Sequence, residues 1–191
     1  MGYQEIWAPW RMAYIASDEN EGNAEKKEAE RENALESCAK LDFLPGADES
    51  CFICQAAADS PQRDKVRHVV LRGENVLVIM NKFPYNNGHL LVTPRRHCSR
   101  LDMLTSGEMF EISQTMVRMI ALLEKTMGPE GFNVGLNLGS VAGAGLPGHV
   151  HWHIVPRWNG DTNFMPVLAC VNVIPQSLDA LWEALRREIE R

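Results

Sequence analysis

The sequence has 191 residues, of which 45% are hydrophobic and 23% are charged, proportions that are ordinary for a globular protein. Its net charge of −6 argues against a general nucleic-acid-binding protein, which usually carries a basic face. No apolar run approaches the ~20 residues of a membrane-spanning helix, and residues 1–5 lack the pattern of a signal peptide, so we expect no membrane partner.

The N-terminal part of the chain differs in composition from the rest. Aromatic residues crowd positions 6–15, and residues 17–40 are rich in Ala, Glu, Lys and Arg, which is typical of an exposed helix or an insertion. We therefore divide the chain into an N-terminal aromatic and charged segment (1–49), a central domain (50–165) and a C-terminal strand and helix packed on that same domain (166–191).

From residue 66 onward the sequence alternates between strand and helix patterns. A capping-box pattern at Thr105 and a helical apolar repeat predict a helix that ends near Gly128, and Ser177 is placed to cap a final helix. Period-two or β-branched stretches predict strands at residues 66–71, 76–81, 89–93, 132–138 and 149–155. The short connections predict an α+β fold, in which a mainly antiparallel sheet of about five strands is covered by helices.

Histidine alternates with apolar residues three times in the last of these strands, at His149, His151 and His153. A strand places alternate side chains on one face, so all three imidazoles would point the same way while Val150 and Trp152 face the core. Three solvated surface histidines would also give this pattern. We favour a catalytic or metal-binding site, because imidazoles packed together need hydrogen-bond partners.

A glycine-rich loop, residues 139–148, precedes the histidines. Such a loop is often only a flexible connection, but glycine also lets backbone N–H groups approach a phosphate closely. Beside three histidines, the loop predicts a phosphate site. The chemistry that fits is attack of a neutral imidazole on phosphorus, with a second step in which water or another acceptor splits the phosphohistidine intermediate.

Two cysteines stand as Cys51-Phe52-Ile53-Cys54 among five in the chain. An odd number with one such pair suits a reducing compartment, and we expect a cytoplasmic protein. The spacing is that of a metal knuckle or a redox pair. No thioredoxin-like βαβ pattern surrounds it, so the metal interpretation is preferred, although two further ligands are then needed.

The run from His149 to Val155 resembles the His-φ-His-φ-His-φ-φ signature (φ apolar) of the histidine triad (HIT) family of nucleotide hydrolases and transferases. Three further stretches are similar to the family's nucleotide-binding segments: residues 78–82, 88–94 and 137–139. The resemblance implies a HIT-like fold and a nucleotide substrate.

The resemblance also implies roles for individual residues. His151 would be the nucleophile that becomes nucleotidylated, with His149 and His153 as the other triad members and His153 at the phosphate or the leaving group. The implied nucleotide-binding residues are Asn81 at the ribose, His89 as an orienting residue, Asn137, and the backbone of Gly145, Leu146 and Gly148 at the phosphate. This chain departs from the family pattern at one position. Many members have Ser or Thr where this chain has Leu146, and that Ser or Thr side chain assists the leaving group.

A zinc site is implied by one branch of the superfamily, the galactose-1-phosphate uridylyltransferases. There, zinc is held by a cysteine pair, a histidine after the strand equivalent to 89–93, and the first triad histidine. The matching residues here are Cys51, Cys54, His97 and His149, and they predict one structural zinc per chain. Four protein ligands leave no open position for an activated water.

The resemblance extends to bacterial diadenosine tetraphosphate phosphorylase-like proteins in residues 7–11 and 155–164. It implies that a dinucleoside polyphosphate is cleaved at the α-phosphate and that inorganic phosphate or water is the acceptor. Trp158 would shape the substrate pocket, although a core or interface position would also explain a tryptophan there. The family usually dimerises, so we expect a homodimer.

Three alternatives stay open from the sequence. The chain could hydrolyse nucleotide phosphoramidates by the same chemistry. It could be a metal hydrolase whose three triad histidines all bind a catalytic zinc with an open water position, which would leave the cysteine pair without a purpose. It could also be a nucleotide sensor without catalytic activity.

Overall fold

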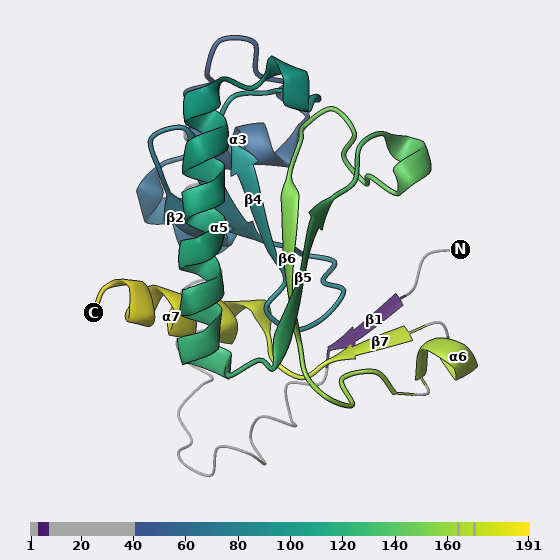
Figure 1. Cartoon of the computed structure of the whole chain (residues 1–191). Helices are drawn as coiled ribbons and strands as arrows, with labels where there is room; N and C mark the ends of the chain where they lie inside the picture. The colour runs from purple at the N-terminus through teal and green to yellow at the C-terminus, as the bar shows by residue number, and fades with distance from the viewer. Residues whose placement is uncertain (1–3, 8–40, 164, 170) are drawn as a thin grey trace.

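A five-stranded antiparallel sheet forms the centre of the protein in the computed structural model, which describes residues 4–7, 41–163, 165–169 and 171–191 (Figure 1). Its strand order is β2-β3-β4-β6-β5, and a separate parallel pair joins β1 to β7. The strands are β1 (Gln4–Trp7), β2 (Val69–Arg72), β3 (Val76–Met80), β4 (Leu90–Pro94), β5 (Gly131–Leu136), β6 (Trp152–Arg157) and β7 (Val171–Ile174). The predicted α+β fold is confirmed.

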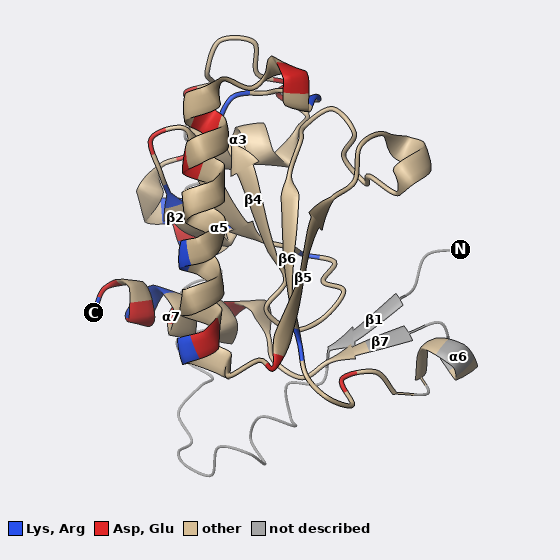
Figure 2. Ribbon diagram, in the orientation of Figure 1, with Lys and Arg blue, Asp and Glu red and all other residues tan. Residues whose placement is uncertain are grey.

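Helices cover both faces of the sheet. They are α3 (Phe52–Ala58), α4 (Asp64–Arg67), α5 (Ser106–Met127), α6 (Met165–Ala169) and α7 (Leu178–Ile189), with 3-10 turns η1 (Pro61–Arg63), η2 (Leu101–Met103) and η3 (Ser140–Ala142). Ile112, Met119 and Leu123 of α5 pack with α7 on one face, whereas α3 packs on the other face against Leu77 and Ile79. Figure 2 shows that charged residues gather on the helices and the connections, while the strands carry few. None of the described helices has the length and apolar character that a bilayer-spanning helix needs.

The strand predicted at 66–71 is wrong in its first half. Helix α4 occupies Asp64–Arg67, and His68 ends it in the left-handed conformation (φ 55°), so that β2 begins only at Val69. The prolyl residue at the start of η1 fixes a helical φ and starts this turn, which the β-branched Val66 does not overcome.

The histidine strand is also shorter than predicted, because β6 begins at Trp152. The ladder with β4 stops at the Val92–Trp152 pair, although Thr93 and Pro94 of β4 come next in the register, opposite His151 and Val150. The Val150 N–H donates instead to Cys98 O (2.7 Å), and Thr93 Oγ1 donates to Val150 O (2.9 Å). The alternation survives: Val150, Trp152 and Ile154 belong to the core, as predicted.

The capping box of α5 is confirmed, and it has a charged partner. Glu108 Oε2 accepts from the Thr105 N–H (2.8 Å), and the Thr105 hydroxyl accepts from the Glu108 N–H (3.2 Å). Arg96, next to His97, donates two hydrogen bonds to the Glu108 carboxylate (2.6 and 2.9 Å). The cap therefore ties the beginning of α5 to the segment that follows β4.

Replacing Glu108 by glutamine lowers the free energy of unfolding near neutral pH by about 1–2 kcal/mol, because buried charge-assisted hydrogen bonds are lost. Hydrogen bonding to Arg96 lowers the pKa of Glu108 from 4.5 to about 2. The carboxylate therefore stabilises the fold above about pH 4.5, and this contribution is lost as the pH falls toward 2. Urea titrations of the wild type and the variant from pH 7 to pH 2 should show that their difference in free energy of unfolding shrinks in that window.

Asp102→Asn is the control for Glu108→Gln. Asp102 forms an exposed ion pair with Arg100, so this substitution should not change the free energy of unfolding measurably. A difference that persists at pH 2 would contradict the assignment.

Candidate active site and metal centre

Four ligand atoms converge at the beginning of α3. Cys51 precedes this helix, Cys54 lies in its first turn, His97 follows β4, and His149 lies in the segment before β6. The two thiols and the two Nδ1 atoms all lie within 4.8 Å of one another. The structure thus brings together all four residues that were predicted as metal ligands.

The geometry and the donor set fit a tetrahedral zinc ion. Cys51 Sγ is 3.4 Å from His149 Nδ1, and Cys54 Sγ is 3.3 Å from His97 Nδ1 and 3.6 Å from His149 Nδ1. Sulfur and nitrogen ligands around one zinc ion stand about 3.6 Å apart. His149 Nε2 donates to Pro94 O (2.9 Å), which leaves the Nδ1 lone pair facing the thiols. Burial lowers the pKa of His149 to about 4, so the ring is neutral at physiological pH.

His151 is held in one tautomer by the residue that faces the thiols. Its Nδ1 lies 2.7 Å from the backbone oxygen of His149, and a carbonyl only accepts, so Nδ1 carries the proton. The lone pair is therefore on Nε2, which has no hydrogen-bond partner among the described residues. This is the arrangement that a nucleophilic imidazole needs.

His153 is oriented by a chain of hydrogen bonds that begins at the backbone. The Tyr85 N–H donates to His89 Nδ1 (3.1 Å), so the proton of His89 is on Nε2, which donates to His153 Nδ1 (2.9 Å). The remaining nitrogen of His153, Nε2, is then a donor, and it is buried without a partner in the described part of the chain. Burial lowers the pKa of His89 to about 3 and that of His153 to about 4, so both rings stay neutral. An N–H in this position suits a phosphate oxygen.

The three imidazoles share one face of the segment, because Val150, Trp152 and Ile154 between them all belong to the core on the other face. On that shared face each ring has a different partner. His149 faces the thiols, His153 faces His89, and the His151 and His153 rings meet edge to face with centroids 5.1 Å apart.

The glycine-rich loop between Asn137 and His149 offers free backbone donors. The N–H groups of Gly145, Leu146 and Gly148 make no hydrogen bonds with the described residues. Asn137 lies one residue beyond the paired Leu136 and Trp152, which places it next to His151, and its Nδ2 is held by Gly143 O (3.5 Å). The side chain of Leu146 packs against the apolar cluster of α3, so only its backbone is available here.

A mainly apolar cavity of about 240 Å³ lies between α3 and the end of β3, and we call it the Phe83 cavity. Arg67, Asn81 and Lys82 contribute its polar side, so the cavity includes Asn81, which was predicted at the ribose. Its walls include Phe52, Ile79 and Phe83. Neither Phe52 nor Phe83 was predicted as a site residue, although Phe83 lies in the loop after β3 with 70% of its surface exposed, and a nucleobase can stack on an aromatic ring of this kind.

Trp158 stands apart from these groups. Its Nε1 donates to Gly128 O (3.2 Å), and the side chain borders another cavity, together with Met127 and Gln176. Within the described residues, the structure does not bring Trp158 to His151.

The fold and the site define a protein class, and comparison with known proteins agrees. The HIT domain family model matches residues 62–160. The chain therefore belongs to the histidine triad family of nucleotide hydrolases and transferases, as the motif predicted.

Two relatives and one solved structure are similar to this chain over about three quarters of its length or more. The AP-4-A phosphorylase of Mycobacterium tuberculosis (strain H37Rv) is 38% identical over 176 residues, which cover 92% of this chain and 78% of that protein. The adenosine 5'-monophosphoramidase hnt1 of Schizosaccharomyces pombe is 26% identical over 141 residues, 74% of this chain and 99% of that protein. In fold, the chain is similar to a crystal structure of a Zn-bound histidine triad family protein from Mycobacterium smegmatis (TM-score 0.57, 24% identity, 74% of this chain and 94% of that one).

Proposed function

We propose that this protein cleaves a dinucleoside polyphosphate at the α-phosphate, through a covalent nucleotidyl group on His151, and transfers that group to inorganic phosphate. The observation that carries the proposal is the 2.7 Å hydrogen bond from His151 Nδ1 to His149 O, which leaves Nε2 as the nucleophile. The similarity to the AP-4-A phosphorylase supports the choice of substrate and acceptor.

In the first step, His151 Nε2 attacks the α-phosphorus, and the bond from that phosphorus to the bridging oxygen breaks. The new N–P bond uses the lone pair of Nε2, and the electrons of the broken bond leave with the polyphosphate half. His153 Nε2–H and the free amides of Gly145 and Gly148 donate to the phosphate oxygens, where negative charge grows. The positive charge on the nucleotidylated ring is shared with the His149 carbonyl through Nδ1–H.

In the second step, an oxygen of inorganic phosphate attacks the same phosphorus from the face that the polyphosphate has left. The N–P bond breaks, and its electron pair returns to Nε2, so His151 is restored in its starting tautomer. The product is a nucleoside diphosphate. Water in place of phosphate would give the monophosphate by the same route.

Leu146 favours a polyphosphate leaving group over an amine. A polyphosphate departs as an anion without first taking a proton, whereas an amine leaves only when it is protonated. Residue 146 has no hydroxyl to relay that proton, and the side chain packs on α3. Nucleotide phosphoramidate hydrolysis, which the relative in S. pombe suggests by its name, is therefore the second candidate.

We propose that zinc is the resident metal of the Cys51, Cys54, His97 and His149 cluster and that its role is structural. When bound, it would fix the ring of His149 and with it the carbonyl that orients His151. The clustering of ligand atoms argues against a catalytic zinc on all three triad histidines, because the group that can hold an ion includes neither His151 nor His153.

The remaining parts of the proposal concern organisation. We propose a homodimer, because β5 is an edge strand of the described sheet and exposes Val134. We propose a cytoplasmic location, because five cysteines with one closely spaced pair suit a reducing compartment. A mass measurement in solution tests the dimer. We also propose that residues 50–165 form the catalytic domain, with 1–49 and 166–191 as additions to it.

Incubation with diadenosine tetraphosphate, with and without inorganic phosphate, tests the function. We expect ADP and ATP in equal amounts, and only when phosphate is present. AMP and ATP regardless of phosphate would make the protein a hydrolase. Unchanged substrate after prolonged incubation would overturn both versions and favour a nucleotide sensor.

A further inference from the structure

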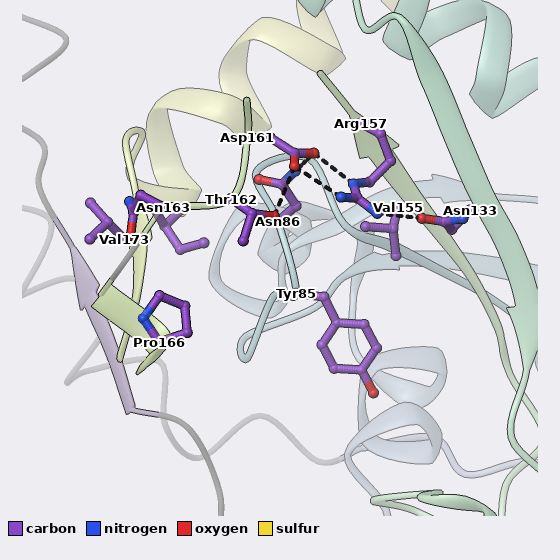
Figure 3. Close-up of a pocket in the computed structure, with 11 residues that line it drawn as sticks. Tyr85, Asn86, Asn133, Val155, Arg157, Asp161, Thr162, Asn163, Pro166 and Val173 are labelled. Atoms are coloured by element: carbon purple, nitrogen blue, oxygen red, sulfur yellow. Dashed lines mark hydrogen bonds and ion pairs between the residues drawn. The ribbon is translucent and has the colours of Figure 1, made fainter. Parts of the chain in front are cut away.

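A second cavity, of about 260 Å³, is lined by Tyr85 and by Val155 and Arg157 of β6, and we call it the Tyr85 cavity (Figure 3). It is similar in volume to the Phe83 cavity, at about 240 Å³, and no residue lines both. Neither step of the proposed reaction at His151 uses a residue of this cavity. Its lining includes Tyr85, Asn86, Asn133, Arg157, Asp161 and Asn163.

One loop supplies an exposed aromatic ring to each cavity. The connection between β3 and β4 carries Phe83 to the first cavity and Tyr85 to the second. Tyr85 is 57% exposed, and its ring stacks on His153 with centroids 5.6 Å apart and planes 23° apart. The ring of His153 therefore lies between Tyr85, which lines this cavity, and the reacting His151, because it contacts the rings of both.

The charges of the Tyr85 cavity cancel. Arg157 is paired with Asp161 through two hydrogen bonds (2.6 and 2.9 Å), and Asn86 also donates to that carboxylate (2.8 Å), as Figure 3 shows. The Arg157 guanidinium holds the pKa of Asp161 well below its ordinary value, so both side chains stay charged and remain bonded to each other. A lining of this kind offers no free cation to a phosphate chain.

The lining does offer what an uncharged base and sugar need. Asn133 accepts from Arg157 Nη1 through its Oδ1 (2.8 Å), and its Nδ2 donates to no described residue. Asn163 likewise uses Oδ1, for the Met165 N–H (2.9 Å), and keeps Nδ2. An exposed aromatic face with spare amide donors is a common way to hold a nucleobase.

We propose that the Tyr85 cavity binds the second nucleoside of a dinucleoside polyphosphate, the one that departs with the leaving group, while the Phe83 cavity holds the nucleoside that stays on His151. This assignment rests on the proposed function. It gives each of the two aromatic residues of the β3–β4 loop a nucleoside to contact, and it makes the protein selective for substrates with a nucleoside at both ends.

The test compares diadenosine tetraphosphate with adenosine 5′-tetraphosphate, which has the same phosphate chain and a single nucleoside. For Tyr85→Ala and Asn133→Leu we expect kcat/KM to fall roughly tenfold with the first substrate, the loss of about one stacking or packing contact. With the second substrate it should change less than about twofold. Tyr85→Phe keeps the ring and should behave as the wild type, whereas Phe83→Ala should impair both substrates.

The outcomes separate the two proposals. If the wild-type protein cleaves neither compound, the proposed function fails. If it cleaves both and Tyr85→Ala and Asn133→Leu impair them equally or not at all, only the second nucleoside site is overturned. Asn133→Leu acts on the cavity without touching His89 or His153, so it guards against an indirect effect of Tyr85→Ala on the histidines.

Discussion

Replacing His151 by asparagine should abolish covalent labelling of the protein by diadenosine tetraphosphate that carries ³²P at the α-phosphate. Turnover should fall at least about 10⁴-fold, because loss of a covalent nucleophile removes the whole two-step route. Asparagine can still donate to the His149 carbonyl, so the segment before β6 should keep its conformation. Denaturation in alkali, which spares the N–P bond, followed by electrophoresis measures the label.

Metal content is the control for this substitution. His151→Asn should retain as much zinc as the wild type, because His151 is not among the clustered ligands. His153→Asn should still take up label, but more slowly, since it removes a donor to the phosphate and leaves the nucleophile. Loss of zinc from His151→Asn, or undiminished labelling, would contradict the assignment of His151.

Replacing Cys54 by serine should cost the protein its zinc and several kcal/mol of stability. A structural zinc contributes directly to folding, and removing one thiolate from a four-ligand site weakens binding steeply. We expect Tm to fall by roughly 10 °C, since each kcal/mol is worth about 2–4 °C in a chain of this size. Elemental analysis of the purified variant and calorimetry measure the two effects.

Cys98→Ser is the matched control for Cys54→Ser. Cys98 is equally buried, but its thiol donates to Arg100 O (3.2 Å) and lies outside the cluster, so zinc content should not change. A wild-type protein that is purified without metal and gains no stability from added zinc would overturn the metal site.

Much of the fold could be predicted from sequence, because local patterns carry it. The α5 helix follows from the box at Thr105 and the stop at Gly128, and both are present. Boundaries failed where a distant partner decides them. β6 starts only at Trp152, because the Val150 N–H bonds to Cys98 O and not to β4, and this cannot be read from residues 149–155 alone.

The candidate site, too, could be predicted only in part from the sequence. The alternation of histidines pointed to a catalytic or metal-binding site, and the resemblance supplied both His151 as the nucleophile and the four residues that the structure brings together as a metal cluster. The hydrogen bonds from Tyr85 through His89 to His153 could not be predicted, since they depend on how one loop folds back over the sheet. Phe52 was missed for a similar reason: α3 reaches the end of β3 only through packing.

The loop between β3 and β4 is closed at its base, where the Asn81 N–H donates to His89 O (3.0 Å) and the two side chains meet (3.3 Å). Because both ends of this loop are held together, residues at its tip can be substituted without moving the strands that carry the histidines. Laboratory evolution confined to positions 83–85 should therefore retune which nucleosides are accepted while turnover chemistry is preserved. An insertion that opens the clamp would change selectivity and chemistry together.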